Sequence, residues 1–180
     1  VPVVPATDDR LRTIIHTSDG SRLEFQDYFV VRRHADSVAD VVFEGATAAT
    51  PAPGVIEALA SAGTVVIAPS NPPLSIWPIL AVPGIRDAVA AHPNVVAVSP
   101  LFGGRALKGP AAAVMETLGL GTGTPAVLAA YAGLIRTLVV DETDRRDVSM
   151  STDDVEVVAA STDLSDGGAA FAEWLLERYA

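Results

Sequence analysis

Cysteine is absent from the 180-residue chain, and lysine occurs once, at Lys108. Without cysteine the chain has no disulfide, no thiolate metal site and no cysteine nucleophile. No apolar run reaches the roughly 18 to 20 residues that a membrane span requires, because proline or glycine interrupts the longest runs. Residues 1–6 lack the basic segment followed by an apolar one that is typical of a signal peptide. These absences favour a soluble protein of the cytoplasm, without a membrane partner.

Positive charge is scarce: 12 lysine and arginine residues stand against 22 aspartate and glutamate residues, for a net charge of −10. A broad basic face for nucleic acid is therefore not expected. Two interpretations of the acidity stay open. Surface carboxylates keep a protein hydrated in a high-salt cytoplasm, or the composition is simply biased towards alanine, aspartate, valine and glycine. Against this background, a cation beside glycines becomes a candidate for holding an anion.

An antiparallel hairpin is predicted near the start of the chain. Two β-rich runs, 10–17 and 22–30, flank the sequence Ser18-Asp19-Gly20-Ser21, and Asp-Gly between such runs is a strong hairpin signal. A third run, 38–43, is expected to extend this sheet. We therefore expect a hairpin excursion over residues 10 to about 45.

Helical segments and short apolar strands alternate from residue 53 onwards. Helices are predicted at 53–62, 85–91, 110–118, 125–132 and 168–179, and strands at 64–68, 94–98, 134–140 and 155–159. Continuous Val/Ile strands that alternate with helices indicate a parallel sheet covered on both faces. The predicted fold class is α/β, a Rossmann-like sheet in a single domain over residues 1–180.

The first unusual strand end follows residues 64–68. Ligands in open α/β sheets bind at the carboxyl ends of the strands, and here Ser70 and Asn71 supply a hydroxyl and an amide. Ser75 is a candidate cap for the next helix, whose free N–H groups would attract phosphate or carboxylate oxygens. The surrounding prolines stiffen the loop and lower the entropy lost on binding. An ordinary proline-rich turn is the alternative.

The second unusual strand end follows residues 94–98. Gly103-Gly104 would allow close approach of a ligand to the backbone, and Arg105 and Lys108 add positive charge before Gly109-Pro110 begins a helix. This combination suits a diphosphate or an acidic substrate, although the spacing is not that of a Walker loop. A loop with solvated cations is the alternative.

Acidic residues mark two further candidate sites. Asp141, Glu142 and Asp144 follow the third predicted parallel strand, where carboxylate oxygens would suit a divalent metal. A solvated acidic turn is the other interpretation. Asp8 and Asp9 pose the same choice, between a site residue and an anchor for the N-terminal loop. No Ser/His/Asp nucleophile pattern is visible, so no catalytic residue is named.

Four segments, TDDRLRT, FQDYFV, APSNPPLSIWPILAVPGIRDAV and VAVSPLFGGRALKGPA, resemble the 2-phospho-L-lactate transferase family (CofD/FbiA) of coenzyme F420 biosynthesis. They occur in the family's order between residue 5 and about 142. The resemblance implies a Rossmann-like transferase that joins lactyl-2-diphosphoguanosine, or its enolpyruvyl counterpart, to the deazaflavin alcohol Fo with release of GMP. It also implies Mg²⁺ as cofactor and a homodimer.

The resemblance places nine residues around one substrate cleft. The residues expected beside the donor phosphates or nucleotide are Ser70, Asn71 and Ser75. The residues expected elsewhere in the lining are Gly103, Gly104, Arg105 and Lys108, and those expected at the mouth are Asp8 and Asp9. The metal ligands are not among them. Pro73 and Trp77 depart from the family pattern, which commonly has a small aliphatic residue and a glycine there, so this loop is expected to be bulkier and stiffer.

The resemblance covers only the latter part of a full family member. The expected N-terminal half, with a glycine-rich first turn, much of the Fo pocket and acidic metal ligands, has no counterpart in the 180 residues. An alternative function is therefore a non-catalytic nucleotide-binding or assembly subunit of the same superfamily.

Overall fold

The computed structural model describes residues 3–106, 109–165 and 167–179. At its centre lies a four-stranded sheet in the order β4-β5-β8-β9. The strands are Val65–Ile67 (β4), Val95–Val98 (β5), Thr137–Asp141 (β8) and Glu156–Ala160 (β9). Every pairing in this sheet is parallel, so the predicted α/β class is confirmed.

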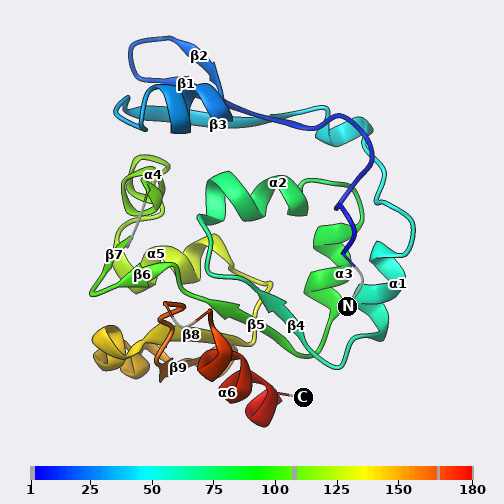
Figure 1. Ribbon diagram of the computed structural model, residues 1–180, viewed down its shortest axis with the longest axis vertical. Helices are drawn as coiled ribbons and strands as arrows, with labels where there is room; N and C mark the ends of the chain where they lie inside the picture. Colours follow the sequence, from blue (N-terminus) through cyan, green and yellow to red (C-terminus); the bar gives the residue numbers. More distant parts are fainter. Residues whose placement is uncertain (1–2, 107–108, 166, 180) are drawn as a thin grey trace.

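Helices cover both faces of the parallel sheet (Figure 1). The helices on one face are Val55–Ser61 (α1), Trp77–Leu80 (α2), Ile85–Ala91 (α3), Ala111–Thr117 (α4) and Gly123–Ala130 (α5), and Ala169–Tyr179 (α6) packs on the other. Successive side chains of a strand point to opposite faces. Val95 and Ala97 therefore join the core under α2 to α5, while Val96 and Val98 pack with Phe171 of α6. This double burial explains why the predicted strands are continuous apolar runs.

A second, antiparallel sheet lies across α2 and α4 from the parallel sheet (Figure 1). Its strands are Arg12–Thr17 (β1), Arg22–Glu24 (β2) and Val38–Glu44 (β3), in the order β2-β1-β3. This sheet has its own core, in which strand residues pack against the helical layer: Ile15, Tyr28, Val38, Leu74 and Val114. The predicted hairpin is thus present, and the helical layer is shared between the two sheets.

The predicted strand over 22–30 is wrong beyond Glu24. The segment Asp27–Val31 forms a π-helical turn (η1) instead, and a short 3₁₀ turn, Ala46–Ala48 (η2), follows β3. The helical turn buries the Tyr28 side chain in the core of the antiparallel sheet, leaving 1% of it exposed. Burial of a large aromatic side chain outweighs the β propensity of this run.

The proline-rich stretch is helical as well. Pro72–Ile76 forms a π-helical segment (η3) that continues into α2. Prolines are tolerated at this start because the first N–H groups of a helix have no partner within it. The large side chain at Trp77 has a structural role. Its Nε1–H donates to the Ala130 carbonyl oxygen at 3.1 Å and so ties α2 to α5.

Two further elements were not predicted from the sequence. Leu101–Phe102 (β6) and Arg105–Ala106 (β7) form a small antiparallel hairpin, and Glu142–Met150 forms a 3₁₀-helical segment (η4) after β8. Within the described ranges no single helix has the length and apolar character to cross a membrane. The segments Pro72–Leu80 and Ile85–Ala91 together have the length and composition of a broken span, with a bend of 96° between them.

Candidate functional site

A cavity of about 520 Å³ lies at the carboxyl end of the parallel sheet. We call it the strand-end cavity. Its polar side comes from the segments that follow β4 and β9, and its apolar side from η1, the segment after β5 and the start of α4. The lining residues used below are Phe25, Phe29, Ser70, Asn71, Ser75, Phe102 and residues 162–165. The position agrees with the rule that open α/β sheets bind ligands at this edge.

Asn71 is held in one orientation at the polar side of the cavity. Its Oδ1 accepts a hydrogen bond from the Leu74 N–H at 3.2 Å, which makes Asn71 the N-cap of η3. Its buried Nδ2 has no hydrogen-bond partner among the described residues. An amide group fixed through its oxygen leaves its two N–H donors for another molecule.

The predicted capping role of Ser75 is therefore wrong, because Ser75 lies inside η3. The expected free N–H groups of this helix start are also missing: Pro72 and Pro73 have none, and the Ser75 N–H donates to the Asn71 carbonyl oxygen at 2.8 Å. Ser70 and Ser75 nevertheless line the cavity beside Asn71. The structure thus brings the three predicted residues of this loop together around one space.

Stacked phenylalanines form the apolar side. The rings of Phe25 and Phe29 lie 5.4 Å apart with an interplanar angle of 20°. They are four residues apart, a spacing that places side chains on one helical face. Gly109 lies against this pair: a Cβ there would be 3.3 Å from a Phe29 ring carbon. Aromatic rings that line a cavity provide apolar surface that suits a planar ring system.

The segment after β9 supplies the remaining polar lining, which was not predicted from the sequence. Both carboxylate oxygens of Asp163 accept hydrogen bonds from Ser165, from its N–H and its hydroxyl, each at 2.9 Å. Asp163 thus shapes its own turn. The signal was available, because a polar run, Ser161-Thr162-Asp163, begins one residue after the predicted parallel strand at 155–159 ends.

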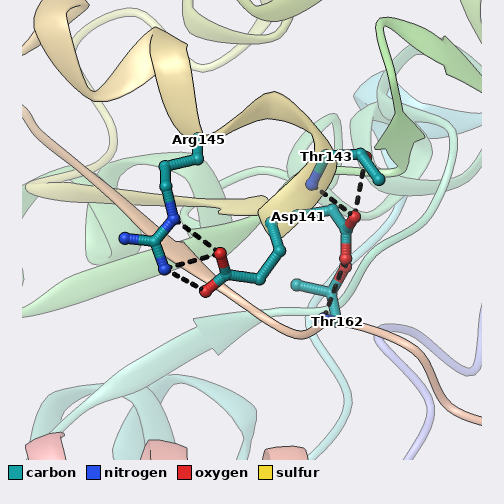
Figure 2. Close-up of polar contacts among 5 residues, drawn as sticks. Asp141, Thr143, Arg145 and Thr162 are labelled. Carbon is teal, nitrogen blue, oxygen red and sulfur yellow. Dashed lines mark hydrogen bonds and ion pairs between the residues drawn. The ribbon is translucent and has the colours of Figure 1, made fainter.

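Asp141 connects the segments after β8 and β9 (Figure 2). Its Oδ1 accepts from the Thr143 N–H at 2.9 Å and hydroxyl at 2.7 Å, and its Oδ2 accepts from the Thr162 N–H at 3.2 Å and hydroxyl at 3.1 Å. Asp141 is 5% exposed, and this burial raises its pKa. The four hydrogen bonds together lower the pKa by more than burial raises it, so the pKa of Asp141 lies below its ordinary value. Asp141 is therefore an ionised anchor beneath the β9 side of the cavity.

The glycine pair is explained by the β6–β7 hairpin. Gly103 and Gly104 have φ values of +59° and +72°, the left-handed conformations that the type I′ two-residue hairpin turn requires at both central positions. The Gly103 N–H donates to the Thr143 hydroxyl at 2.9 Å, which joins the hairpin to the Asp141 anchor. Gly103, Gly104 and Arg105 do not belong to the described lining of the cavity. Their contact with a ligand stays a prediction, and Lys108 lies outside the described residues.

The acidic turn after β8 differs from the interpretation as a solvated turn. It is not solvated as a whole, because Asp141 and Asp144 are buried while Glu142 pairs with Arg145 at 2.6 Å. Nor do the described residues form any group of three His, Cys, Asp or Glu side chains that could hold a metal. Because Mg²⁺ is usually bound through only one or two protein carboxylates, magnesium stays a prediction.

Asp144 is a buried and incompletely paired carboxylate of this turn. It is 9% exposed, and its Oδ2 has no partner within the described part of the chain. Burial is the main cause of its raised pKa, and the carboxylates of Asp147 and Asp141 add to the rise.

Asp144→Asn is expected to stabilise the protein by about 1 kcal/mol at pH 7, because it removes a buried, incompletely paired charge. A raised folded-state pKa means that the penalty is absent at low pH and appears as pH rises above the ordinary value of 3.8. Urea unfolding from pH 3 to 7 measures this trend. Asp153→Asn, at an exposed position, is the control and should leave stability unchanged; a destabilised Asp144→Asn would contradict this interpretation.

The other predicted acidic pair lies away from the cavity. The Asp9 carboxylate accepts from the Thr50 N–H at 2.8 Å and from the Thr50 hydroxyl at 3.0 Å. The Thr50 N–H is the main cause of a lowered Asp9 pKa. Asp9 therefore anchors the N-terminal loop, as one of the two sequence interpretations had it. Asp8 is exposed and, like Asp9, is not among the lining residues, so a ligand role for the pair stays a prediction.

The comparison with known proteins decides the family. The model of the family described as 2-phospho-L-lactate transferase CofD matches residues 1–168. The chain belongs to the CofD family. Its sequence resemblance to that family is thereby confirmed.

Relatives of this CofD chain share about two fifths of its residues. A phosphoenolpyruvate transferase of Kitasatospora aureofaciens is 43% identical over 155 residues, 83% of this chain and 48% of the relative. One from Thermobifida fusca is 42% identical over 170 residues (92% and 52%), and the 2-phospho-L-lactate transferase of Methanothermobacter thermautotrophicus is 40% identical over 142 residues (79% and 45%). The chain spans about half the length of the curated relatives it matches.

A solved structure supports the fold alone. A member of the UPF0052 family from Bacillus halodurans superimposes with a TM-score of 0.61 at 16% sequence identity, covering 96% of this chain and 60% of that one.

Proposed function

We propose that this chain supplies the strand-end cavity of a transferase that moves a phospholactyl or phosphoenolpyruvyl group from a guanylylated donor to Fo and releases GMP. Family membership and the names of the relatives support the reaction class. The observation that carries the proposal is the fixed Asn71 amide, whose donors have no partner among the described residues, beside the stacked Phe25 and Phe29. One end of the cavity suits an oxygen-rich group and the other a planar ring.

In this reaction the Fo hydroxyl attacks the phosphorus that carries the three-carbon acid, the bond to the GMP oxygen breaks, and the hydroxyl proton passes to solvent. Such a step depends on in-line positioning and on charge neutralisation. Asn71 would donate to a phosphate or nucleobase oxygen, and the Phe25–Phe29 pair would orient a ring by stacking. Asp141 would hold the Thr162 segment in place through its hydrogen bonds.

A second function is favoured by the charges of the cavity. Asp163 is the one charged residue among the described residues that line it, and its oxygens are engaged by Ser165. The described lining thus has no cationic side chain to neutralise a diphosphate and no group of three metal-ligating side chains. This favours the alternative of a nucleotide-binding subunit whose chemistry is completed by residues elsewhere.

Incubation of the chain with Fo, Mg²⁺ and the guanylylated donor separates the two functions. Formation of GMP together with the coupled product, and of neither without Fo, supports the transferase. Saturable binding of GDP without turnover supports the nucleotide-binding subunit. Absence of both binding and turnover would overturn the assignment of the cavity.

A further inference from the structure

A basic turn, Arg32-Arg33-His34, follows the π-helical segment η1 beside the strand-end cavity. The His34 ring lies 5.6 Å from the Phe29 ring at an angle of 45°. Phe29 is itself part of the cavity lining and is 39% exposed. The basic turn therefore lies one ring away from the apolar side of the cavity, at its mouth.

The basic turn has an unusual backbone conformation. Arg33 and His34 have φ values of +51° and +48°, and in the described part of the chain they are the only residues other than glycine with a positive φ. Left-handed conformations cost free energy in residues that carry a Cβ, and even asparagine and aspartate adopt them as single residues. Glycine would end η1 at lower cost, as it does in many helices.

Neighbouring groups hold the basic turn in this conformation. The His34 N–H donates to the Tyr28 carbonyl oxygen at 2.8 Å, and the Tyr28 side chain is fixed in the core of the antiparallel sheet. The Arg32 N–H donates to the Asp27 carbonyl oxygen at 2.8 Å, and the Arg32 guanidinium pairs with Asp36 at 3.3 Å. Costly backbone conformations persist only where the surroundings determine them, and they cluster at functional sites.

The side chains of the two left-handed residues have polar groups available for a ligand. Arg33 and His34 are exposed, and neither side chain makes a hydrogen bond or an ion pair with a described residue. A guanidinium group has five N–H donors, and an imidazole has at least one. Donors of this kind bind phosphate oxygens, and arginine does so with two parallel hydrogen bonds.

We propose that Arg33 and His34 form a phosphate subsite at the mouth of the strand-end cavity, for a diphosphate whose attached ring lies inside the cavity. The described lining has no cationic side chain, so the basic turn would supply positive charge that the lining lacks. The subsite also explains the left-handed residues, because glycine would end η1 without supplying a donor. The position of the ring, though not the phosphate contact, rests on the proposed function.

Isothermal titration calorimetry with inorganic pyrophosphate, guanosine and GDP tests the subsite. Arg33→Gly and His34→Gly keep a backbone that accepts positive φ and remove the side chains. Each is expected to weaken binding of pyrophosphate and of GDP by about tenfold and to leave guanosine affinity unchanged. Arg33→Gly should also shift the midpoint of urea unfolding to a higher concentration, because glycine relieves the cost of the left-handed conformation.

Arg136→Gln is the matched control for the loss of charge. Arg136 is exposed and directly precedes β8, at the edge of the parallel sheet opposite the cavity. This variant should leave all three affinities unchanged.

The outcomes separate the subsite from the proposed function. Pyrophosphate that fails to bind the unaltered chain, or that binds both glycine variants as well as the unaltered chain, would overturn the subsite. A lower urea midpoint for Arg33→Gly together with undiminished binding would assign the basic turn to the end of η1 alone and also overturn it. If guanosine does not bind while pyrophosphate binds through both side chains, the subsite stands and the proposed occupant of the cavity fails.

Discussion

Replacement of Asp141 by alanine is expected to lower the free energy of unfolding by about 3 kcal/mol at pH 7. The carboxylate accepts four hydrogen bonds, two from Thr143 and two from Thr162. The N–H and hydroxyl of Thr162, a residue 2% exposed, would be left buried without a partner, and each such loss costs about 1 to 3 kcal/mol. Urea unfolding monitored by circular dichroism measures the change.

Glu142→Gln is the matched control for Asp141→Ala, because the neighbouring carboxylate makes an exposed ion pair with Arg145. Surface pairs contribute about 0 to 1 kcal/mol, so the control should unfold almost as the unaltered chain does. A loss below 1 kcal/mol for Asp141→Ala would show that the segments after β8 and β9 hold their positions without this anchor.

The pH dependence of the same variant provides an independent check. The folded-state pKa of Asp141 lies below its ordinary value of 3.8, so its contribution is complete above that pH and is lost as pH falls through the folded-state value. The stability gap between the unaltered chain and Asp141→Ala should therefore be constant near neutrality and shrink below pH 3.8. A gap that widens in acid would contradict the ionised state assigned to this carboxyl.

Asn71→Asp is expected to weaken binding of GDP at least tenfold and to lower the free energy of unfolding by about 1 kcal/mol, because its second carboxylate oxygen would be buried without a partner among the described residues. Aspartate keeps the oxygen that caps η3 through the Leu74 N–H, and aspartate and asparagine are similarly good N-caps. It replaces the unpartnered Nδ2 donor with a negatively charged oxygen, which repels phosphate; a tenfold loss corresponds to about 1.4 kcal/mol. Isothermal titration calorimetry with GDP and urea unfolding separate the two effects.

Asn94→Asp is the matched control for the binding experiment. The Asn94 Nδ2 donates to the Thr64 hydroxyl at 2.6 Å at the amino end of the sheet, away from the strand-end cavity. This substitution should leave GDP affinity unchanged whatever it does to stability. Equal losses of affinity in both variants would mean that the Asn71 effect is not local to the cavity.

The parallel sheet was predictable because its signal is local. The strands β5 and β8 are rich in valine and leucine and are buried along their whole length, and burial on both faces produces a continuous apolar sequence. The strand β4 has the same apolar composition, although Val66 is 46% exposed. The family resemblance was equally local, carried by the motifs around Ser70 and Gly103.

Local reasoning failed where distant packing decides the structure. Nothing within residues 25–30 indicates that Tyr28 must reach the core of the antiparallel sheet, so propensity predicted a strand. The sequence also predicts a loop at Pro72 and Pro73, whereas Asn71 caps a helix that begins with these prolines.

Asp141 shows the same limit at the candidate site. Its carboxylate was predictable as a strand-end residue, but its buried role depends on Thr162, 21 positions away in sequence. Gly103-Gly104 likewise has the residue types of a ligand loop, and the structure uses them for a hairpin turn.

Nuclear magnetic resonance of the ¹⁵N-labelled chain during titration with GDP tests the central claim, that the strand-end cavity is the nucleotide site. We expect saturable shifts that are largest for the Asn71 side-chain amide and for the backbone amides of Ser70 and Thr162. Saturable shifts confined to residues outside the cavity, or no saturation at about millimolar GDP, would contradict it.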